Sequence, residues 1–411
     1  MRKSHFRALV LASAAIAGPG VASPYSDIYF FGDSLLDNGQ FDGLRFTNRV
    51  GPNYETSAYG PVSPDFIAEG LNLTEAAPSR AGGTNYAVGG NESAETLASV
   101  NAATTYQAPY AVDRPDSGLN PTFNSLFYNL QQSDQSFQKN ALYILDGGGN
   151  DIGNGKVFDD ASAAVVATNM VDAAQALRAR GAKYVVIANV PDFGLAPAGV
   201  PFSEFASEMA AKVNTSIQQQ IGDDNILIFD SFSLLQEVVA NPGAYGLPLS
   251  STEASLACFS TSVGTCSEGN AAAKLDGSNP DPDQFYFNDF LHQTTIGQQI
   301  TGDYILSVLQ APGEIGLLPQ MGIDDMQSQW RSAHPIMRAN RWQPATPVGS
   351  YSVWGGANWN EADHETSYNN TGTNKATQYN VGINFRPAHN WYIGGQLGRA
   401  DNELEIGRAH V

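Results

Sequence analysis

The sequence has few cationic residues and no long apolar segment. It has 21 lysines and arginines and 41 aspartates and glutamates, which gives a formal charge of −20. Nucleic-acid-binding surfaces need clustered cations, so we expect no nucleic-acid partner. A transmembrane helix needs about 20 consecutive apolar residues, and no stretch after the first residues supplies them. Any contact with a membrane would therefore have to use β-strands.

Cysteine is equally scarce. The chain has only Cys258 and Cys266, and no histidine lies near them in the sequence. In an exported protein these two residues can close a small loop as a disulfide, and two separate thiols are the alternative. A zinc site is not expected, because such sites need four Cys, His or carboxylate ligands close together. We expect neither a metal nor a cofactor.

Residues 1–23 have the three-part pattern of a secretory signal peptide. Arg2, Lys3 and Arg7 precede a short apolar run over residues 9–17, and small residues over 20–22 offer a cleavage site. This pattern directs export, and its apolar part is too short to span a membrane. We expect export through the Sec pathway.

Residues 24–312 have the pattern of an α/β domain. Short apolar runs without polar alternation are typical of strands buried on both faces of a parallel sheet. They alternate with segments of helical spacing, which predicts a doubly wound fold. The expected strands are 27–31, 82–90, 142–145, 184–188 and 226–229. The expected helices are 64–71, 161–180, 202–221, 231–240 and 294–309, with Pro312-Gly313 ending the last one.

The pattern changes after residue 312. The residue pattern over 313–348 predicts a linker, which is amphipathic over 322–341. Within 349–411, three segments of about ten residues alternate apolar and polar side chains: 350–359, 377–385 and 391–397. This is typical of transmembrane β-strands, and a water-soluble β-meander is the alternative. Single-chain barrels have at least about 8 strands, so we expect only the start of a barrel, with the chain ending inside it.

Ser34 is the candidate nucleophile. It follows the first expected strand, at the edge where open α/β sheets bind their ligands. A serine hydroxyl needs a neighbouring base to accept its proton. His292 is the only histidine of the expected α/β domain, and Asp289 precedes it by three residues. A carboxylate there can orient the imidazole. The alternative is a histidine at a helix start, with Asp289 as a nearby cap.

Three donors at strand ends are candidates for an oxyanion hole, which acyl transfer requires. They are the backbone N–H groups of Ser34 and Gly90 and the side-chain amide of Asn150. An ordinary tight turn at Gly90 and a local loop bond at Asn150 are the alternatives. Residues 147–150 are glycine-rich but lack the lysine and the serine or threonine of a phosphate-binding loop.

Four blocks of the sequence together resemble a known family. In chain order they are FGDSLLDNG, GGTNYAVGG, LDGGGND and NDFLH. They are similar to the four signature blocks of the GDSL/SGNH hydrolases, over about residues 27–309. The resemblance implies a flavodoxin-like sandwich, with Gly89 as an alternative to Gly90. It assigns Ser34, Asp289 and His292 to the catalytic triad, and Ser34, Gly90 and Asn150 to the oxyanion hole.

The resemblance implies a serine esterase or lipase that hydrolyses carboxylic esters through an acyl-enzyme. The leader and the C-terminal strands resemble those of autotransporter esterases of Gram-negative bacteria. We therefore expect a location at the outer membrane and cell surface, or secretion, and a small-molecule or lipid ester as the partner. A lipid acyltransferase, a lysophospholipase and a non-catalytic surface adhesin are the alternatives. Tyr106, Tyr110, Phe123 and Phe127 either line an acyl groove or pack as ordinary core.

Overall fold

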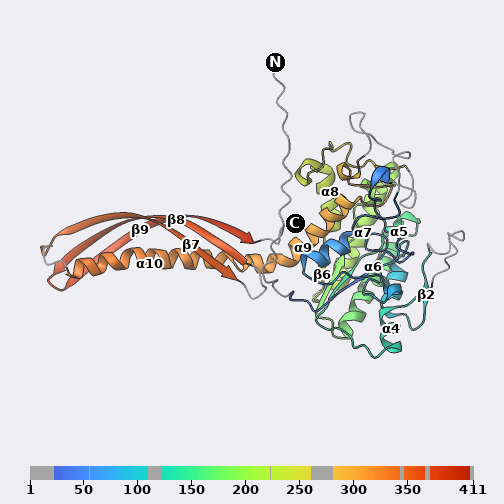
Figure 1. The fold of residues 1–411 in the computed structure, drawn as a ribbon, viewed down its shortest axis with the longest axis horizontal. Coiled ribbons are helices and arrows are strands. Elements are labelled where there is room, and N and C mark those ends of the chain that lie inside the picture. Colours follow the sequence, from blue (N-terminus) through green and yellow to red (C-terminus); the bar gives the residue numbers. More distant parts are fainter. Residues whose placement is uncertain are drawn as a thin grey trace, which may run out of the picture.

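The computed structural model describes residues 23–54, 56–109, 122–222, 224–260, 281–342, 347–365 and 371–407. Figure 1 shows a rounded α/β domain beside an elongated unit, which the strands β7 (Tyr351–Glu365), β8 (Thr371–Ala388) and β9 (Trp391–Gly407) form together with helix α10 (Leu318–Trp342). Two consecutive helices connect the two parts. Residues 1–22 of the expected signal peptide and Cys266 of the expected disulfide lie outside the described residues.

The α/β domain is built on a four-stranded parallel sheet in the order β1-β4-β5-β6. Its strands are β1 (Ile28–Phe31), β4 (Leu142–Leu145), β5 (Tyr184–Ala188) and β6 (Leu227–Phe229). The sequence placed each of these strands within one residue of its observed bounds. Apolar side chains occupy nearly every position because both faces of the sheet are covered.

The expected strand at 82–90 does not form a strand. Its Tyr86 N–H donates to Phe30 O at 2.7 Å, and Asn85 makes a single parallel bridge to Phe30. On the opposite side of the segment, the N–H of Asn85 donates to Ala77 O at 3.0 Å, and Asn85 makes a second isolated bridge to Pro78. The segment nevertheless lies next to β1. The sheet thus keeps the strand order of a flavodoxin-like fold.

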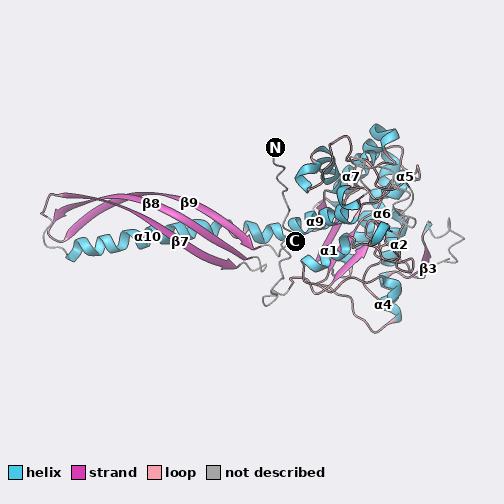
Figure 2. Ribbon diagram, turned by 45° about the horizontal axis from the view of Figure 1, so that its top comes forward, coloured by secondary structure: helices cyan, strands magenta, loops and turns pink. Residues whose placement is uncertain are grey.

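Helices cover both faces of this sheet (Figures 1 and 2). One face packs against α2 (Ser93–Asn101), α6 (Asp160–Ala179) and α7 (Ser203–Ile221). The other packs against α1 (Ser63–Gly70) and α9 (Thr295–Ile315). None of the described helices is both long and apolar enough to cross a membrane.

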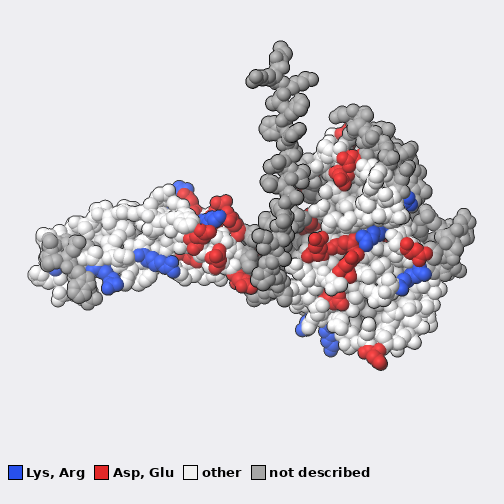
Figure 3. All heavy atoms as spheres, in the orientation of Figure 1, with Lys and Arg blue, Asp and Glu red and all other residues white. Residues whose placement is uncertain are grey.

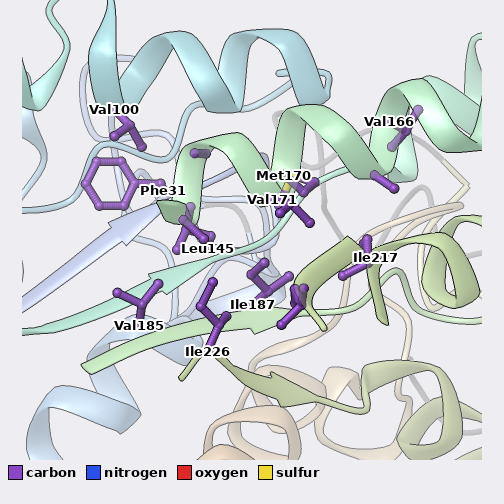
Figure 4. Close-up of a cluster of buried hydrophobic side chains, with 14 of the residues drawn as sticks. Phe31, Val100, Leu145, Val166, Met170, Val171, Val185, Ile187, Ile217 and Ile226 are labelled. Atoms are coloured by element: carbon purple, nitrogen blue, oxygen red, sulfur yellow. The ribbon is translucent and has the colours of Figure 1, made fainter. Parts of the chain in front are cut away.

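Alternate residues of each strand enter the two hydrophobic clusters. In β1, Phe31 packs with Val100, Met170 and the other residues of the cluster shown in Figure 4. Its neighbour Phe30 points to the opposite face and packs with Ile67 of α1. Both phenylalanines are fully buried, and together the clusters hold the carboxyl ends of the strands in place.

Shorter elements complete the domain. The hairpin strands are β2 (Tyr106–Gln107) and β3 (Thr122–Phe123), and the short helices are α4 (Leu126–Gln132), α5 (Gly149–Gly153) and α8 (Ser231–Ala240). The 3₁₀ turns are η1 (Pro52–Tyr54), η2 (Ser79–Ala81), η4 (Phe193–Leu195), η5 (Val200–Phe202), η6 (Pro242–Tyr245) and η9 (Pro282–Gln284).

The last helix of the domain is longer than expected. Helix α9 continues to Ile315 with Pro312 inside it, so the prediction that Pro312-Gly313 ends the helix is wrong. Proline lacks an N–H, but its carbonyl still accepts from Gly316 N–H at 3.3 Å. One missing hydrogen bond bends or weakens a helix without necessarily ending it. The next helix, α10 (Leu318–Trp342), begins three residues after α9 ends.

The C-terminal unit is a three-stranded antiparallel sheet, which agrees with the expected start of a β-barrel. Its strands are β7 (Tyr351–Glu365), β8 (Thr371–Ala388) and β9 (Trp391–Gly407), in that order. They are longer than the ten residues expected from the apolar alternation. Lys375 of β8 is paired with Glu361 of β7 on one side and with Glu403 of β9 on the other. Pairs of opposite charge therefore extend the strands beyond the segments of apolar alternation.

Helix α10 lies along one face of this sheet (Figure 1). Asp324 of the helix accepts a hydrogen bond from the Asn374 side chain at 2.8 Å, and Asp325 accepts one from Asn402 at 2.7 Å. The face toward the helix is therefore polar. The opposite face exposes the apolar side chains Tyr351, Val353, Trp359, Tyr379, Val381, Ile383, Trp391, Ile393 and Leu397.

Candidate active site

Ser34 and His292 meet at the carboxyl edge of the parallel sheet. Ser34 lies in the turn after β1, and His292 lies in the loop between η9 and α9. The distance from Ser34 Oγ to His292 Nε2 is 2.9 Å, although 258 residues separate them in the sequence. The structure thus brings the expected nucleophile within hydrogen-bonding distance of the expected base.

Asp289 contacts the other nitrogen of the imidazole. Both of its carboxylate oxygens lie 3.0 Å from His292 Nδ1. The backbone N–H groups of Leu291 and His292 also donate to Asp289 Oδ1, at 2.9 and 2.8 Å. The side chain that caps α9 is Thr294, which accepts from Gly297 N–H. The Asp289 carboxylate therefore pairs with the imidazole, whereas Thr294 caps the helix.

The pKa shifts of this pair favour an ionised carboxylate beside a protonated imidazole. Burial alone would lower the pKa of His292, but the charge and hydrogen bond of Asp289, with a smaller contribution from Asp33, raise it above its ordinary value. Burial alone would raise the pKa of Asp289, but the charge and hydrogen bonds of His292 lower it. The environment therefore stabilises the imidazolium that forms when a serine hydroxyl loses its proton.

Asn150 reaches the same site from α5. Its side-chain amide donates to Asn91 O at 2.8 Å, and the residue lines a cavity together with Ser34. An amide nitrogen carries two hydrogens, so one remains for a second acceptor. The bond to Asn91 O also places Asn150 next to Gly90, the residue that precedes Asn91.

The two glycines considered for the oxyanion hole differ in their hydrogen bonds. The N–H of Gly89 donates to Asp37 Oδ2 at 2.8 Å and is therefore engaged. Within the described part of the chain, the N–H groups of Gly90 and Ser34 have no protein acceptor. Gly90 has a φ of +83°, a conformation that suits glycine. This geometry favours Gly90 over Gly89 as a donor.

Comparison with known proteins identifies the family of the α/β domain. Residues 28–305 match the family model described as GDSL-like lipase/acylhydrolase. The chain belongs to this family. The expected GDSL resemblance is confirmed, and the α/β domain is that of a carboxylic ester hydrolase.

Three relatives extend the likeness beyond the GDSL-like domain. An uncharacterized Pseudomonas putida protein from the trpE-trpG intergenic region is 33% identical over 439 residues, covering 99% of this chain and 69% of the relative. Esterase EstA of Pseudomonas aeruginosa is 31% identical over 440 residues, covering 97% and 65%. Lipase 1 of Photorhabdus luminescens is 25% identical over 496 residues, covering 100% and 68%. The chain spans about two thirds of the length of these relatives.

Two buried carboxyl groups of the GDSL-like domain lie behind the nucleophile, and sequence reasoning missed them. Asp33 N–H donates to Asp146 Oδ1 at 2.9 Å, and Leu35 N–H donates to Asp33 Oδ1 at 3.0 Å. Gly32 has a φ of +151°, and a Cβ there would lie 1.5 Å from Asp146 Oδ1. The glycine leaves room for the carboxyl group that holds the turn before Ser34.

The pKa values of both carboxyl groups lie above the ordinary value for aspartate. Burial raises the pKa of Asp33 to about 6. Burial, followed by the charge of Asp33, raises the pKa of Asp146 well above its ordinary value. The pair therefore resists carrying two negative charges. A sequence signal existed, because Asp146 directly follows β4 and Asp33 follows β1 after a single glycine, and these two strands are paired.

A cavity of about 70 Å³ opens beside Ser34. Its polar lining residues are Asp33, Ser34, Asn150, His292 and Gln293. The apolar part of the lining, which we call the apolar wall, consists mainly of Leu35, Val190, Pro191, Phe193, Ala196, Leu235, Tyr286, Phe287 and Leu291. A wall of this kind suits the acyl chain of an ester. No group of three or more His, Cys, Asp or Glu among the described residues could hold a metal ion.

The acyl groove considered from the sequence is not at this site. Phe123 and Phe127 are buried in two hydrophobic clusters, and Tyr106 packs against Phe123. None of these three lines the cavity beside Ser34. Tyr110 lies outside the described residues. The ordinary packing alternative therefore holds for the three described residues.

Proposed function

We propose that this protein hydrolyses carboxylic esters through an acyl-enzyme, with Ser34 as nucleophile, His292 as general base and Asp289 orienting the imidazole. The distance of 2.9 Å between Ser34 Oγ and His292 Nε2 carries the proposal. His292 takes the hydroxyl proton as Ser34 Oγ attacks the ester carbonyl carbon, and Asp289 stabilises the imidazolium. The alcohol then leaves with that proton.

In the second half of the reaction, His292 accepts a proton from water as the water oxygen attacks the acyl carbon. The bond from that carbon to Ser34 Oγ then breaks, His292 returns the proton to Oγ, and the acid is released. Each half passes through an oxyanion. The N–H groups of Ser34 and Gly90 and the amide of Asn150 would donate hydrogen bonds to it. The acyl chain would lie against the apolar wall of the cavity, away from the polar triad.

The direct test replaces Ser34 with alanine and measures hydrolysis of p-nitrophenyl butyrate. We expect kcat to fall by about 10⁴-fold or more, as when a triad serine is removed from other hydrolases. Ser99→Ala, at another buried serine, is the matched control and should keep its activity. A phosphonate inhibitor should add covalently to Ser34, as intact-mass measurement would show. Full activity in Ser34→Ala would disprove the proposal.

We also propose that the protein is exported and that the apolar face of β7–β9 contacts the outer membrane, leaving the α/β domain at the cell surface. Tyr351 to Trp359 of β7 cover nine residues, close to the 9–11 that a tilted membrane-spanning strand requires. Acidic residues, including Glu361 and Asp363, follow this apolar band, and Figure 3 shows acidic side chains gathered at the end of the sheet nearest the α/β domain.

Membrane fractionation tests this second proposal. Val381 is 54% exposed in the middle of the apolar band. Val381→Arg should reduce the membrane-bound fraction, because arginine at the bilayer midplane costs about 2–4 kcal/mol. Thr373→Arg, at the acidic end of the same strand, is the control. A wild-type protein found entirely in the soluble fraction without detergent would contradict the proposal.

A further inference from the structure

We propose that exposed apolar side chains at the mouth of the catalytic cavity dock on an uncharged or zwitterionic lipid surface that contains the ester. This inference rests on the proposed ester hydrolysis and specifies the form in which the substrate is met. The apolar rim, as we call it, consists of Val200, Phe202, Phe205, Phe290 and Leu291.

The rim gathers nearly half of the exposed large apolar side chains of the α/β domain. Phe202 is 71% exposed, Val200, Phe205 and Phe290 are each 49% exposed, and Leu291 is 39% exposed. These are five of the eleven large apolar side chains that are exposed among the described residues between 23 and 309. Single exposed apolar residues are normal on a protein surface, but a group of them indicates an interaction surface.

Hydrogen bonds join the two segments of the rim to each other and to the cavity. Ala198 N–H donates to Phe290 O at 2.9 Å, which ties the segment before α7 to the loop before His292. Val200 N–H donates to Ala196 O at 3.0 Å, and both Ala196 and Leu291 line the cavity beside Ser34. The rim therefore continues the apolar wall of the cavity outward to the surface.

The topology places the rim on the correct edge of the sheet. Helix α7 connects β5 to β6, which are parallel, so it begins at the carboxyl edge of the sheet. Ser34 follows β1 at that same edge. A lipid surface that contacts Phe202 and Phe205 at the start of α7 would therefore face the cavity mouth.

The charged residues of the two rim segments indicate which type of lipid surface the rim can contact. Over residues 196–205 the only charged side chain is Glu204. Over residues 287–293 the titratable side chains are Asp289 and His292, which pair with each other. Neither segment contains lysine or arginine, and the whole chain has a formal charge of −20. An anionic membrane would be repelled, whereas a neutral ester droplet or a phosphatidylcholine surface offers apolar contact without that cost.

A catalytic test compares one acyl chain in two physical states. The full chain is assayed on dissolved p-nitrophenyl butyrate and on a tributyrin emulsion. We expect the Phe202→Ser/Phe205→Ser double variant to keep kcat/KM on the dissolved ester within about twofold, and to lose about tenfold on the emulsion. Leu227→Ser, at an exposed position on the opposite edge of the sheet, is the matched control and should leave both rates unchanged.

A binding test is independent of turnover and of the C-terminal strands. In a Ser34→Ala background, an environment-sensitive dye is attached to Phe202→Cys or, as control, to Leu227→Cys. Phosphatidylcholine vesicles should shift the emission of the dye at position 202 to shorter wavelength and leave the dye at 227 unchanged. Phosphatidylglycerol vesicles should give a smaller shift at 202.

The outcomes separate this inference from the proposed function. Absence of Ser34-dependent hydrolysis of the dissolved ester would overturn the proposed function, while the vesicle shift at 202 would still support lipid docking. Ser34-dependent hydrolysis, with no loss on the emulsion in the double variant and no dye shift, would overturn the docking alone. A wild-type dimer that the double variant disrupts, without a dye shift, would also overturn it, because a second copy of the chain would then be the occupant.

Discussion

The backbone N–H of Asp33 donates to the carboxyl group of Asp146 across 2.9 Å, which ties the turn after β1 to the turn after β4. The nucleophile follows Asp33 by one residue, so this bond fixes the backbone from which Ser34 projects. The hydrogen bond from Asp33 N–H to Asp146 requires a glycine at position 32. With any Cβ at that position, Asp146 could not stay where it is.

Gly32→Ala should therefore cost both stability and activity. The added methyl would lie 1.5 Å from Asp146 Oδ1, and the φ of +151° is strained for alanine. We expect a loss of about 2–4 kcal/mol in the free energy of unfolding and a lower kcat. Gly246→Ala is the control, since its φ of +77° is also positive, in the left-handed helical region, but no atom lies within 4 Å. It should cost about 1–2 kcal/mol and leave kcat unchanged. Equal effects of both variants would contradict a special role of Gly32.

Replacing Asp289 with asparagine should change the pH profile as well as the rate. Protonation of His292 removes the base, so kcat/KM of the wild type should fall as pH decreases through a pKa above the ordinary value for histidine. Asp289→Asn removes the largest cause that raises this pKa. The acidic limb should therefore move to lower pH, while the plateau falls by about 10⁴-fold. The check is kcat/KM between pH 5 and 9, with Asp283→Asn as a control in the same loop region. An acidic limb that stays in place would argue against His292 as the titrating base.

Asn150→Ala tests the oxyanion hole. The variant keeps the triad but loses a donor at the place where negative charge develops. We expect kcat to fall by about 10²–10³-fold with little change in KM. Asn154→Ala, at the end of α5, removes a comparable amide that bonds to Glu92 outside the cavity, and it should leave kcat nearly unchanged. A rise in KM at constant kcat would instead assign Asn150 to substrate binding.

The apolar wall predicts how acyl preference can be altered. Leu234 and Leu235 are adjacent in α8 and similarly buried, at 6% and 4% exposure, but only Leu235 lines the cavity. Truncating either leucine to alanine should cost about 2–5 kcal/mol of stability. Only Leu235→Ala should shift the rate profile toward longer p-nitrophenyl esters. The same shift in Leu234→Ala would mean that the cavity does not hold the acyl chain.

Much of the catalytic geometry could be anticipated from the sequence. Ser34 lies three residues past the end of a buried strand, and the expected α/β domain offers a single histidine with an aspartate three residues before it. These are local signals, so they do not depend on how the rest of the chain folds. Gly90 and Asn150 were candidates from their places at expected strand ends, and the resemblance of the four blocks assigned both to the oxyanion hole. The structure brings Asn150 to the same cavity as Ser34.

Features that depend on packing between segments distant in the sequence could not be predicted from local patterns. Phe193 and Leu235 meet at the cavity from η4 and α8, and nothing in their own segments marks them as its wall. The segment around Asn85 was predicted as a strand because its residue composition is typical of a strand. In the structure its backbone hydrogen bonds are shared between β1 and residues 77–79. The length of β7–β9 was underestimated because charged pairs, such as Lys375 with Glu405, continue the sheet where the apolar signal stops.

The separation of 258 residues between Ser34 and His292 has a consequence for the timing of activity. Chains are made from the N-terminus, so a growing chain carries Ser34, the proposed nucleophile, long before His292, the proposed base, exists. Contacts between such distant positions form late, since loop closure over that span must come first. Esterase turnover is therefore a reporter of the completed α/β fold, and partly made chains or early intermediates should not hydrolyse esters in the cell that makes them.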